Sequence, residues 1–336
     1  MNRIYLKLKM FCVILLLFFS NNIKAQDTRD QAIKFHGLLR LIDAFYVDTT
    51  NVKTLTEEAI VGMLKKLDPH SVYISKDEVE DMNEPLMGSF SGIGIQFNIL
   101  NDTLMVVATI SGGPSEKVGL RAGDRIIEID KENIAGVGLK NSGVRKRLKG
   151  ERGTEVTVKV KRKGENEPLD FLIIRDKIPI YSLDAKYMVD NRIGYIRLNR
   201  FAATTVTEFE QAMNELLKKG MKDLILDLRG NGGGFMGAAI KLVDNFLDGT
   251  KKIVYTQGKS SLQSDNYSTP GGKFLKGKIA VLIDEGSASA SEIVSGAVQD
   301  WDRGIIIGRR SFGKGLVQRQ FPLSDQCGDR TLLPPV

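Results

Sequence analysis

The spacing of apolar and polar positions changes twice along the chain. Between residues 29 and 82 the apolar residues recur three and four positions apart, as in amphipathic helices; they include Leu38, Leu39, Leu41, Ile42, Phe45, Ala59, Ile60, Met63 and Leu64. This spacing predicts an N-terminal helical region over residues 26–87.

Within this region the sequence Asp68-Pro69-His70-Ser71 interrupts the helical pattern. Proline disfavours helical geometry in the residue before it, so we expect a turn that ends the second helix. We therefore interpret His70 as a structural residue rather than a catalytic one.

From residue 88 to residue 175 short segments of alternating apolar and polar residues replace the helical pattern. The clearest segments cover residues 94–97, 104–107, 125–129 and 156–160. Glycine-rich and asparagine-rich turns separate them, which indicates a compact β-rich domain. Two short helices are expected in it, near residues 115–118 and 139–148.

Strands and helices alternate in the remaining part, residues 176–336. Strands are expected at residues 193–198, 223–228, 279–283 and 304–308, and helices at residues 206–218, 237–247 and 289–300. Such alternation predicts an α/β core with a largely parallel sheet, whose active site would lie at the carboxyl ends of the strands. The predicted fold class is multidomain α/β.

The first 25 residues carry much of the positive charge of the chain. There are 48 Lys and Arg against 41 Asp and Glu, and four of the basic residues, Arg3, Lys7, Lys9 and Lys24, lie in this segment without an acidic residue. Setting them aside (48 less 4, against 41) leaves an excess of only three. This balance does not indicate a nucleic-acid partner.

The same 25 residues have the pattern of a secretory signal peptide. A basic start precedes an apolar run from Met10 to Phe19, polar residues follow, and Ala25 stands before Gln26. The run is short for a bilayer span, and an uncleaved inner-membrane anchor stays open as the alternative. Both alternatives export the remaining chain, so we expect it in the periplasm or cell envelope of a bacterium.

Cysteine and histidine usage limits the chemistry. Cys12 lies in the signal segment, so only Cys327 would remain and no intrachain disulfide is expected in the mature chain. With His36 and His70 as the only histidines, a zinc site is not expected, and we predict no metal and no other cofactor.

One candidate loop, Asp227-Leu228-Arg229-Gly230-Asn231-Gly232-Gly233-Gly234, follows an apolar strand. Its glycines allow unusual backbone geometry, and their N–H groups are suited to face an anion. It lacks the Gly-Lys-Ser/Thr ending of a phosphate loop and the dinucleotide spacing, so nucleotide binding is not expected. A loop needed only for tight packing remains the alternative.

A second loop, residues 284–293, contains three serines between an apolar strand and a helix: Ser287, Ser289 and Ser291. A serine nucleophile needs a base, and neither histidine is near in sequence. Lysine can serve if its pKa, about 10.4 in water, is lowered toward 7 by a desolvated pocket. Lys314 lies between two glycines after a predicted buried strand and fits this role. The alternative for a serine is that it only caps the helix, and the alternative for Lys314 is that it is an ordinary solvated surface residue.

The β-rich region resembles a PDZ domain in Ser91-Gly92-Ile93-Gly94-Ile95 and in residues 112–124. Glycines let backbone N–H groups converge on a carboxylate. The resemblance therefore implies that Gly92, Ile93 and Gly94 bind a peptide's C-terminus, while the peptide adds as a strand to the sheet edge. A tight turn at the glycines remains the alternative.

The two loops and the segment Ser311-Phe312-Gly313-Lys314-Gly315, downstream of a PDZ-like region, resemble motifs of the carboxyl-terminal processing, or tail-specific, serine peptidases. The resemblance runs from about Asp30 to Pro322. The resemblance implies a peptidase core of the crotonase/Clp-protease type. It also implies protein or peptide substrates with apolar C-termini, and it leaves a homodimer open.

By the same resemblance Ser289 is the nucleophile, Lys314 its general base and Gln318 the residue that orients the lysine. The backbone N–H groups of Ala290 and Gly234 would form the oxyanion hole.

The resemblance ends near Asp325, where the family pattern would continue with further strands and a helical part. The chain stops at residue 336, so we expect a truncated peptidase core over residues 176–336. Two alternatives stay open: a PDZ-type peptide-binding adaptor with an inactive hydrolase-like core, and a crotonase-like acyl-CoA enzyme. We interpret the basic residues 145–149 and Arg152 as a solvated face rather than as a contact with the core or the substrate.

Overall fold

The computed structural model describes residues 27–259, 261–323 and 331–333. The chain divides into two compact units, Met1–Tyr73 and Ile74–Val336. The predicted signal peptide, Cys12 and Cys327 lie outside the described residues.

The first unit is helical over residues 27–45 and in α2 (Val52–Leu64). The side chain of Asn51 caps α2 by accepting a hydrogen bond from the N–H of Thr54 at 3.1 Å. The predicted turn is present, because the Asp68 carboxylate accepts hydrogen bonds from the N–H groups of His70 and Ser71 at 2.7 and 2.8 Å. The pattern did not predict the short strand β1 (Val72–Ile74) that follows the turn.

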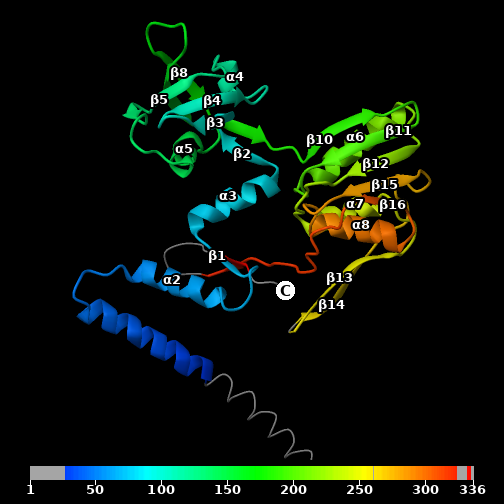
Figure 1. The fold of residues 1–336 in the computed structure, drawn as a ribbon, viewed down its shortest axis with the longest axis horizontal. Helices are drawn as coiled ribbons and strands as arrows, with labels where there is room; N and C mark the ends of the chain where they lie inside the picture. Colours follow the sequence, from blue (N-terminus) through cyan, green and yellow to red (C-terminus); the bar gives the residue numbers. More distant parts are fainter. Residues whose placement is uncertain (1–26, 260, 324–330, 334–336) are drawn as a thin grey trace, which may run out of the picture. The chain divides into compact units, whose positions relative to one another are not determined.

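The second unit begins with α3 (Lys76–Met87) and a β domain. Figure 1 labels β3, β4, β5 and β8 of the main sheet of this domain. The strands of this sheet follow one another in the order β3-β4-β5-β7-β8, and β6 pairs with β5. The strands are β3 (Ile95–Ile99), β4 (Leu104–Thr109), β5 (Arg125–Ile129), β6 (Glu132–Asn133), β7 (Glu155–Lys161) and β8 (Leu169–Ile174). Neighbouring strands are antiparallel.

The alternation predicted for this domain is confirmed by the side chains that fill its core. These buried residues come from one face of β4, β5, β7 and β8 and from one helix: Leu104, Val106, Ile126, Val144, Val156, Val158, Val160 and Ile173. Both predicted helices are present, as α4 (Pro114–Lys117) and α5 (Asn141–Leu148). A separate pair, β2 (Ser89–Gly92) and β9 (Asp176–Pro179), joins the two ends of the domain.

The third predicted region forms an α/β core around a five-stranded sheet in the order β10-β11-β12-β15-β16. Its strands are β10 (Leu183–Met188), β11 (Ile193–Leu198), β12 (Asp223–Asp227), β15 (Ile279–Ile283) and β16 (Ile305–Gly308). The last four strands are parallel, as predicted, and β10 is antiparallel to β11.

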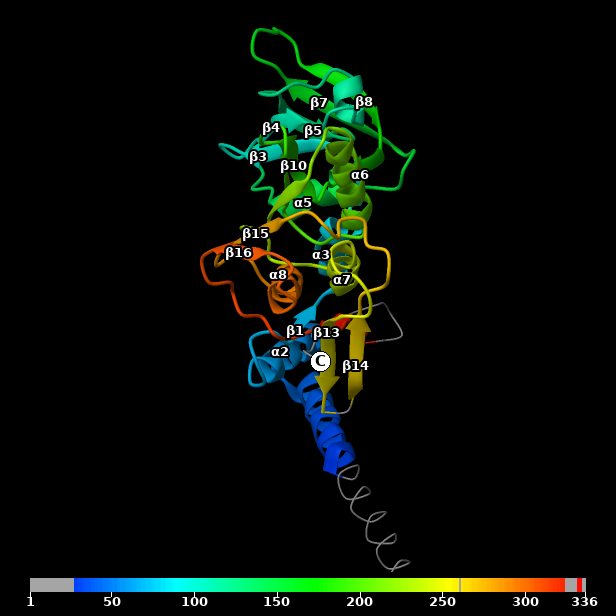
Figure 2. The same cartoon turned by 90° about the vertical axis from the view of Figure 1, so that its right-hand side faces the viewer.

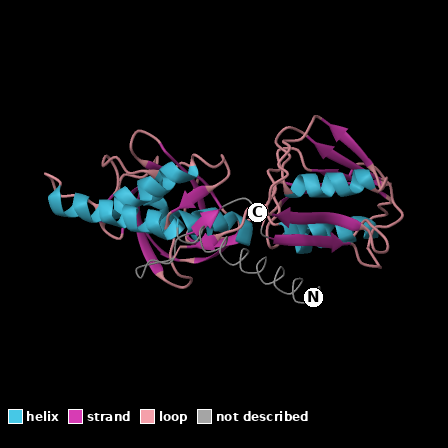
Figure 3. Ribbon diagram, turned by 90° about the horizontal axis from the view of Figure 1, so that it is seen from below, coloured by secondary structure: helices cyan, strands magenta, loops and turns pink. Residues whose placement is uncertain are grey.

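Three helices cover this sheet: α6 (Thr205–Lys218), α7 (Met236–Asp244) and α8 (Ala290–Asp300). Helix α7 packs against both α6 and α8, and Figure 3 shows helices of this core beside its strands. The core is built from fully buried residues of both layers, among them Phe201, Phe209, Leu226, Leu242, Val281 and Val294.

The hairpin of β13 (Lys252–Gly258) and β14 (Ser261–Tyr267) was not expected; Figure 2 shows its two strands side by side. Near the C-terminal end β17 (Phe321–Pro322) pairs with β18 (Thr331–Leu333). Every helix within the described ranges is too short or too polar to traverse a lipid bilayer.

The prediction that a buried strand precedes Lys314 is wrong. Among the described residues β16 is the last strand of its sheet and pairs only with β15, and Ile305 is 62% exposed and Ile307 is 47% exposed. Helix α7 also ends at Asp244, three residues before the predicted end.

Candidate active site

Three loops leave the carboxyl ends of neighbouring parallel strands. We call them the glycine loop (residues 228–234, after β12), the serine loop (residues 284–289, after β15) and the lysine loop (residues 309–318, after β16). Since parallel strands end at the same edge of a sheet, the three loops meet there.

The structure distinguishes the three serines that spacing left equivalent. Ser287 is fully buried, and its hydroxyl donates to the carbonyl oxygen of Leu228 at 2.8 Å. Ser291 is also fully buried, and its hydroxyl donates to the carbonyl oxygen of Asn231 at 2.8 Å. Ser289 is half-buried, so it is the serine whose hydroxyl can meet a substrate.

Ser289 occupies a strained turn directly before α8. Its φ of 56° and ψ of −110° lie outside the regions that residues with a side chain normally adopt. Such a conformation costs about 1–3 kcal/mol and persists where the surroundings enforce it. Here the N–H of Ser289 donates to Oε2 of Glu292 at 2.7 Å, which holds the turn.

The glycine loop touches this turn. A Cβ atom on Gly233, whose φ is 99°, would lie 2.8 Å from the carbonyl oxygen of Ala288 and 2.9 Å from Cβ of Ser289. A Cβ atom on Gly234, whose φ is 142°, would lie 2.1 Å from the carbonyl oxygen of Phe201. Both positions therefore require glycine for lack of space as well as for conformation.

Two backbone donors remain free where these loops meet. Among the described residues, the N–H groups of Ala290 and Gly234 donate to no protein group. The neighbouring N–H of Gly233 donates to Oδ1 of the buried Asn231 at 2.9 Å, which orients the loop. Free N–H groups on two contacting backbone segments can bind a developing oxyanion.

Lys314 is half-buried, and its Nζ donates to Oε1 of Gln318 at 2.5 Å. The predicted pairing of lysine and glutamine side chains is thus present. Within the described part of the chain, no hydrogen bond joins Nζ of Lys314 to Oγ of Ser289.

The carboxylate of Glu292 links the serine loop to the lysine loop. Oε2 accepts the N–H groups of Ser289 and Lys314, at 2.7 and 2.9 Å. Oε1 accepts the N–H of Gly313 at 2.6 Å and the hydroxyl of Ser311 at 2.7 Å.

Four hydrogen bonds to one carboxylate favour its charged form. Burial by itself would raise the pKa of Glu292, but the hydrogen bonds from Ser311, Ser289, Gly313 and Lys314 outweigh it and hold the pKa below its ordinary value. Glu292 has no role among the sequence-based predictions. The Ser-x-x-Glu spacing typical of a helix start was a usable signal.

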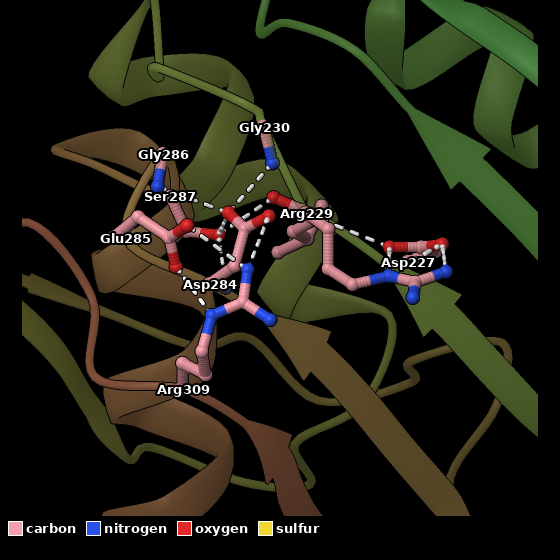
Figure 4. A network of polar contacts seen from close by, with 9 residues as sticks. Asp227, Arg229, Gly230, Asp284, Glu285, Gly286, Ser287 and Arg309 are labelled. Carbon is pink, nitrogen blue, oxygen red and sulfur yellow. Dashed lines mark hydrogen bonds and ion pairs between the residues drawn. The ribbon is translucent and has the colours of Figure 1, made fainter.

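A second buried carboxylate stands where β12 ends. Asp227 is fully buried and accepts hydrogen bonds from Nη2 of Arg229 and from the hydroxyl of Tyr195, both at 2.6 Å. Burial alone would raise the pKa of Asp227, but these hydrogen bonds hold it below its ordinary value. Figure 4 shows the Asp227–Arg229 pair, which anchors the start of the glycine loop and was not among the sequence-based predictions.

In the β domain Gly92, Ile93 and Gly94 lie together at one pocket. The pocket has a volume of about 260 Å³, and its walls are mostly apolar: Phe90, Ile95, Phe97, Leu148 and Ile180. The carbonyl oxygen of Ile93 accepts the N–H and the buried hydroxyl of Ser115, at 3.0 and 2.6 Å. In the described structure the N–H groups of Ile93 and Gly94 donate to no protein group.

The basic residues near α5 form ion pairs. Arg147 pairs with Glu132 at 2.7 Å and Lys149 with Glu84 at 2.6 Å. The side chain of Lys149 is only 20% exposed, so the interpretation as a merely solvated face is wrong for this residue. In the same described ranges, no three side chains of His, Cys, Asp or Glu gather as they would around a metal ion.

Comparison with known proteins gives a consistent assignment. The model of peptidase family S41 matches residues 192–332, a PDZ domain model matches residues 91–173, and the model named activating protease CtpB N-terminal domain matches residues 18–78.

Two curated relatives extend over most of this chain. A carboxy-terminal-processing protease of Bartonella bacilliformis is 39% identical over 305 residues, which span 89% of this chain and 69% of the relative. A probable CtpA-like serine protease of Staphylococcus aureus is 35% identical over 317 residues, which span 92% of this chain and 62% of the relative.

Among solved structures, a photosystem II D1 C-terminal processing protease is 26% identical, with 90% of this chain and 86% of that chain covered at a TM-score of 0.48. The three family models occur in the order of the regions described above, with the PDZ domain ahead of the peptidase core. On the S41 match and the identity with the Bartonella protein, the chain belongs to peptidase family S41 and, within it, to the carboxy-terminal processing proteases.

Proposed function

We propose that this protein is a serine endopeptidase that cleaves exported proteins near apolar C-terminal tails, with Ser289 and Lys314 as its catalytic dyad. One observation carries the proposal: a single carboxylate, Glu292, accepts hydrogen bonds from the backbone of both residues. That contact brings the serine loop and the lysine loop together, although α8 and β16 separate them in the chain.

The reaction is an acyl transfer. The uncharged amine of Lys314 takes the proton of the Ser289 hydroxyl while Oγ attacks the carbonyl carbon of the scissile peptide bond. The tetrahedral intermediate collapses, the C–N bond breaks, and Lys314 returns the proton to the leaving amine. Water, activated by the same amine, then attacks the acyl-enzyme and releases the free serine.

The contact with Gln318 suits this role of the lysine. An uncharged amine has two N–H donors and one lone pair. Donation of one N–H to Oε1 of Gln318 at 2.5 Å leaves the lone pair available for the serine proton. Gln318 is thus a positioning residue that directs the lone pair.

The free N–H groups of Ala290 and Gly234 would receive the negative oxygen of the intermediate. Loss of one such donor costs about 100- to 1,000-fold in kcat in comparable hydrolases. The close packing of Gly233 on Ser289 keeps these donors beside the nucleophile.

The PDZ domain would select the substrate. The free N–H groups of Ile93 and Gly94 are suited to a terminal carboxylate, and the apolar walls of the adjoining pocket are suited to the last side chain. An extended peptide in this groove adds as a strand beside β3. These features support a preference for apolar tails.

Incubation of the full chain with a folded protein that carries an unstructured apolar tail tests the assignment. We expect a shortened product by mass spectrometry, and no product with Ser289→Ala or with an amidated, charged tail. Cleavage that survives Ser289→Ala would contradict the catalytic assignment. Tail binding without cleavage by the unmutated chain would favour a peptide-binding adaptor.

We also propose that residues 1–25 direct export and that the remaining chain acts in the periplasm or cell envelope. The support is the basic start and the apolar run of this segment. The mass of the protein recovered from the cell envelope should correspond to a chain that begins at Gln26. A full-length mass would instead indicate an uncleaved anchor, and recovery from the cytoplasm alone would contradict export.

A further inference from the structure

We infer that Asp284 is a positioning residue that sets the distance between the two oxyanion donors. This inference rests on the proposed function. Asp284 follows β15 and begins the serine loop. Its Oδ1 accepts the N–H of Gly230 at 2.8 Å and the N–H of Gly286 at 3.0 Å, as Figure 4 shows. One carboxylate oxygen therefore links the glycine loop to the serine loop.

The two loops are in direct contact at this point. A Cβ atom on Gly286 would lie 3.0 Å from Cα of Gly230. The hydroxyl of Ser287 lies 3.3 Å from Oδ1 of Asp284 but 2.8 Å from the carbonyl oxygen of Leu228, so its single proton goes to the carbonyl. Ser287 in turn accepts the N–H of Asp284 at 3.0 Å. The carboxylate is thus held at the seam of the two loops.

The position of this seam matters for catalysis. Gly230 stands four residues before Gly234 in the glycine loop, and Gly286 of the serine loop stands four residues before Ala290, the first residue of α8. One proposed oxyanion donor therefore ends the glycine loop and the other begins α8 directly after the serine loop. The Asp284 bridge joins the two loops shortly before each donor. Hydrogen bonds weaken steeply as distance and angle depart from their optimum, so separation of the loops would impair both donors.

Arg309 supports the bridge from the lysine loop. Its guanidinium pairs with Glu285 at 2.6 Å and has Nη2 at 3.9 Å from Oδ2 of Asp284. Hydrogen bonds from Arg309 lower the pKa of Glu285 to about 2. Because Arg309 and Glu285 are both largely exposed, their ion pair contributes little, and the backbone hydrogen bonds of Asp284 carry the positioning.

Three full-chain variants test the inference. Asp284→Ala removes the acceptor, and we expect kcat to fall about 10- to 100-fold with little change in KM, as for a displaced oxyanion donor. Asp284→Asn keeps an Oδ1 that accepts both N–H groups, so it should restore kcat. Asp244→Ala is the matched control: this carboxylate accepts the N–H and hydroxyl of Thr269 in the same core, so its loss should lower stability without lowering kcat.

Hydrogen exchange provides a readout that needs no cleavage. In Asp284→Ala the amides of Gly230 and Gly286 should exchange about tenfold faster, and in Asp284→Asn they should exchange at the wild-type rate. If the wild-type chain cleaves nothing, the peptidase proposal fails and exchange alone decides the positioning role. If Asp284→Ala does not fold, Asp284→Ser replaces it, because a hydroxyl is too short to reach both amides.

Two results would overturn the inference. One is unchanged exchange at both glycines in the alanine variant, which would mean that Asp284 does not hold the loops. The other is an asparagine variant as impaired as the alanine variant, which would mean that charge and not geometry is required.

Discussion

The backbone N–H groups of Ser289 and Lys314 share one acceptor, Oε2 of Glu292, at 2.7 and 2.9 Å. Their two nitrogen atoms cannot lie farther apart than the sum of these distances. The residues stand on different loops and are separated by helix α8 and strand β16 in the sequence. The carboxylate of Glu292 thereby holds the backbone of the proposed nucleophile close to the backbone of the proposed base.

The chemical requirement for an uncharged amine predicts the behaviour of Lys314 variants. Lys314→Ala should lower kcat by about 1,000-fold or more, because the serine loses its base. Lys314→Arg should not restore cleavage, since guanidinium stays protonated and has no lone pair to accept a proton. Steady-state cleavage of a tailed peptide, with circular dichroism to confirm folding, measures both. An active arginine variant would exclude Lys314 as the general base.

The lowered pKa of Glu292 predicts a pH-dependent contribution to stability. The pKa is lower in the folded chain than in the unfolded chain, so the contribution is complete above the unfolded value, near 4.5. It is lost as the pH falls through the lower folded value. The free energy of unfolding should therefore fall more steeply in the wild type than in Glu292→Gln between about pH 6 and pH 3.

Urea unfolding at several pH values measures this difference. Glu292→Gln should also cleave more slowly at neutral pH. The side-chain amide has one oxygen that accepts hydrogen bonds and one NH₂ group that only donates them, so it cannot accept all four hydrogen bonds. Parallel stability curves for the two proteins would contradict the assigned role of the carboxylate.

Crowding at Gly233 predicts that the glycine loop tolerates a side chain at one position and not at another. Gly233→Ala places a Cβ atom 2.9 Å from that of Ser289 at a φ of 99°, so we expect a loss of stability of about 1–3 kcal/mol and a large loss of cleavage. Gly232→Ala is the control in the same loop, because no atom lies within 4 Å of its added Cβ. Thermal unfolding and cleavage assays compare the two. Equal effects would show that the contact with Ser289 is unimportant.

Substitutions in the apolar pocket of the PDZ domain should weaken peptide binding, whereas substitutions outside the pocket should not. Phe97→Ala should weaken binding of an apolar-tailed peptide by about 10- to 100-fold, which corresponds to the loss of one buried aromatic contact. Val107→Ala on β4, a 42% exposed position outside the pocket, should bind normally. Calorimetry with free-acid and amidated peptides measures the affinities. Equal affinity of both peptide forms would exclude terminal carboxylate recognition.

Several elements were predictable because the spacing of their apolar residues matches the burial of those residues in the fold. Strands β11 and β15 have the predicted bounds, and α8 begins within one residue of its predicted start. The same logic failed at β16, where Ile305, Ile306 and Ile307 indicate a buried strand. An apolar run does not say how many neighbouring strands a strand has, and within the described ranges β16 has one.

The sequence by itself determined the helical pattern of the N-terminal region and the chemical groups that are available for a site. These groups are the glycines around Ile93, three serines in one loop and one lysine between two glycines. Only the tertiary structure decided that Ser287 and Ser291 are buried while Ser289 is accessible. It also decided that Glu292 and Asp284 join the loops. Apart from the local Ser289–Glu292 contact, which the Ser-x-x-Glu spacing indicates, their partners are mainly backbone N–H groups of other loops. Every residue except proline carries such a group, so residue identity cannot reveal these partners; the meeting of three parallel strand ends does.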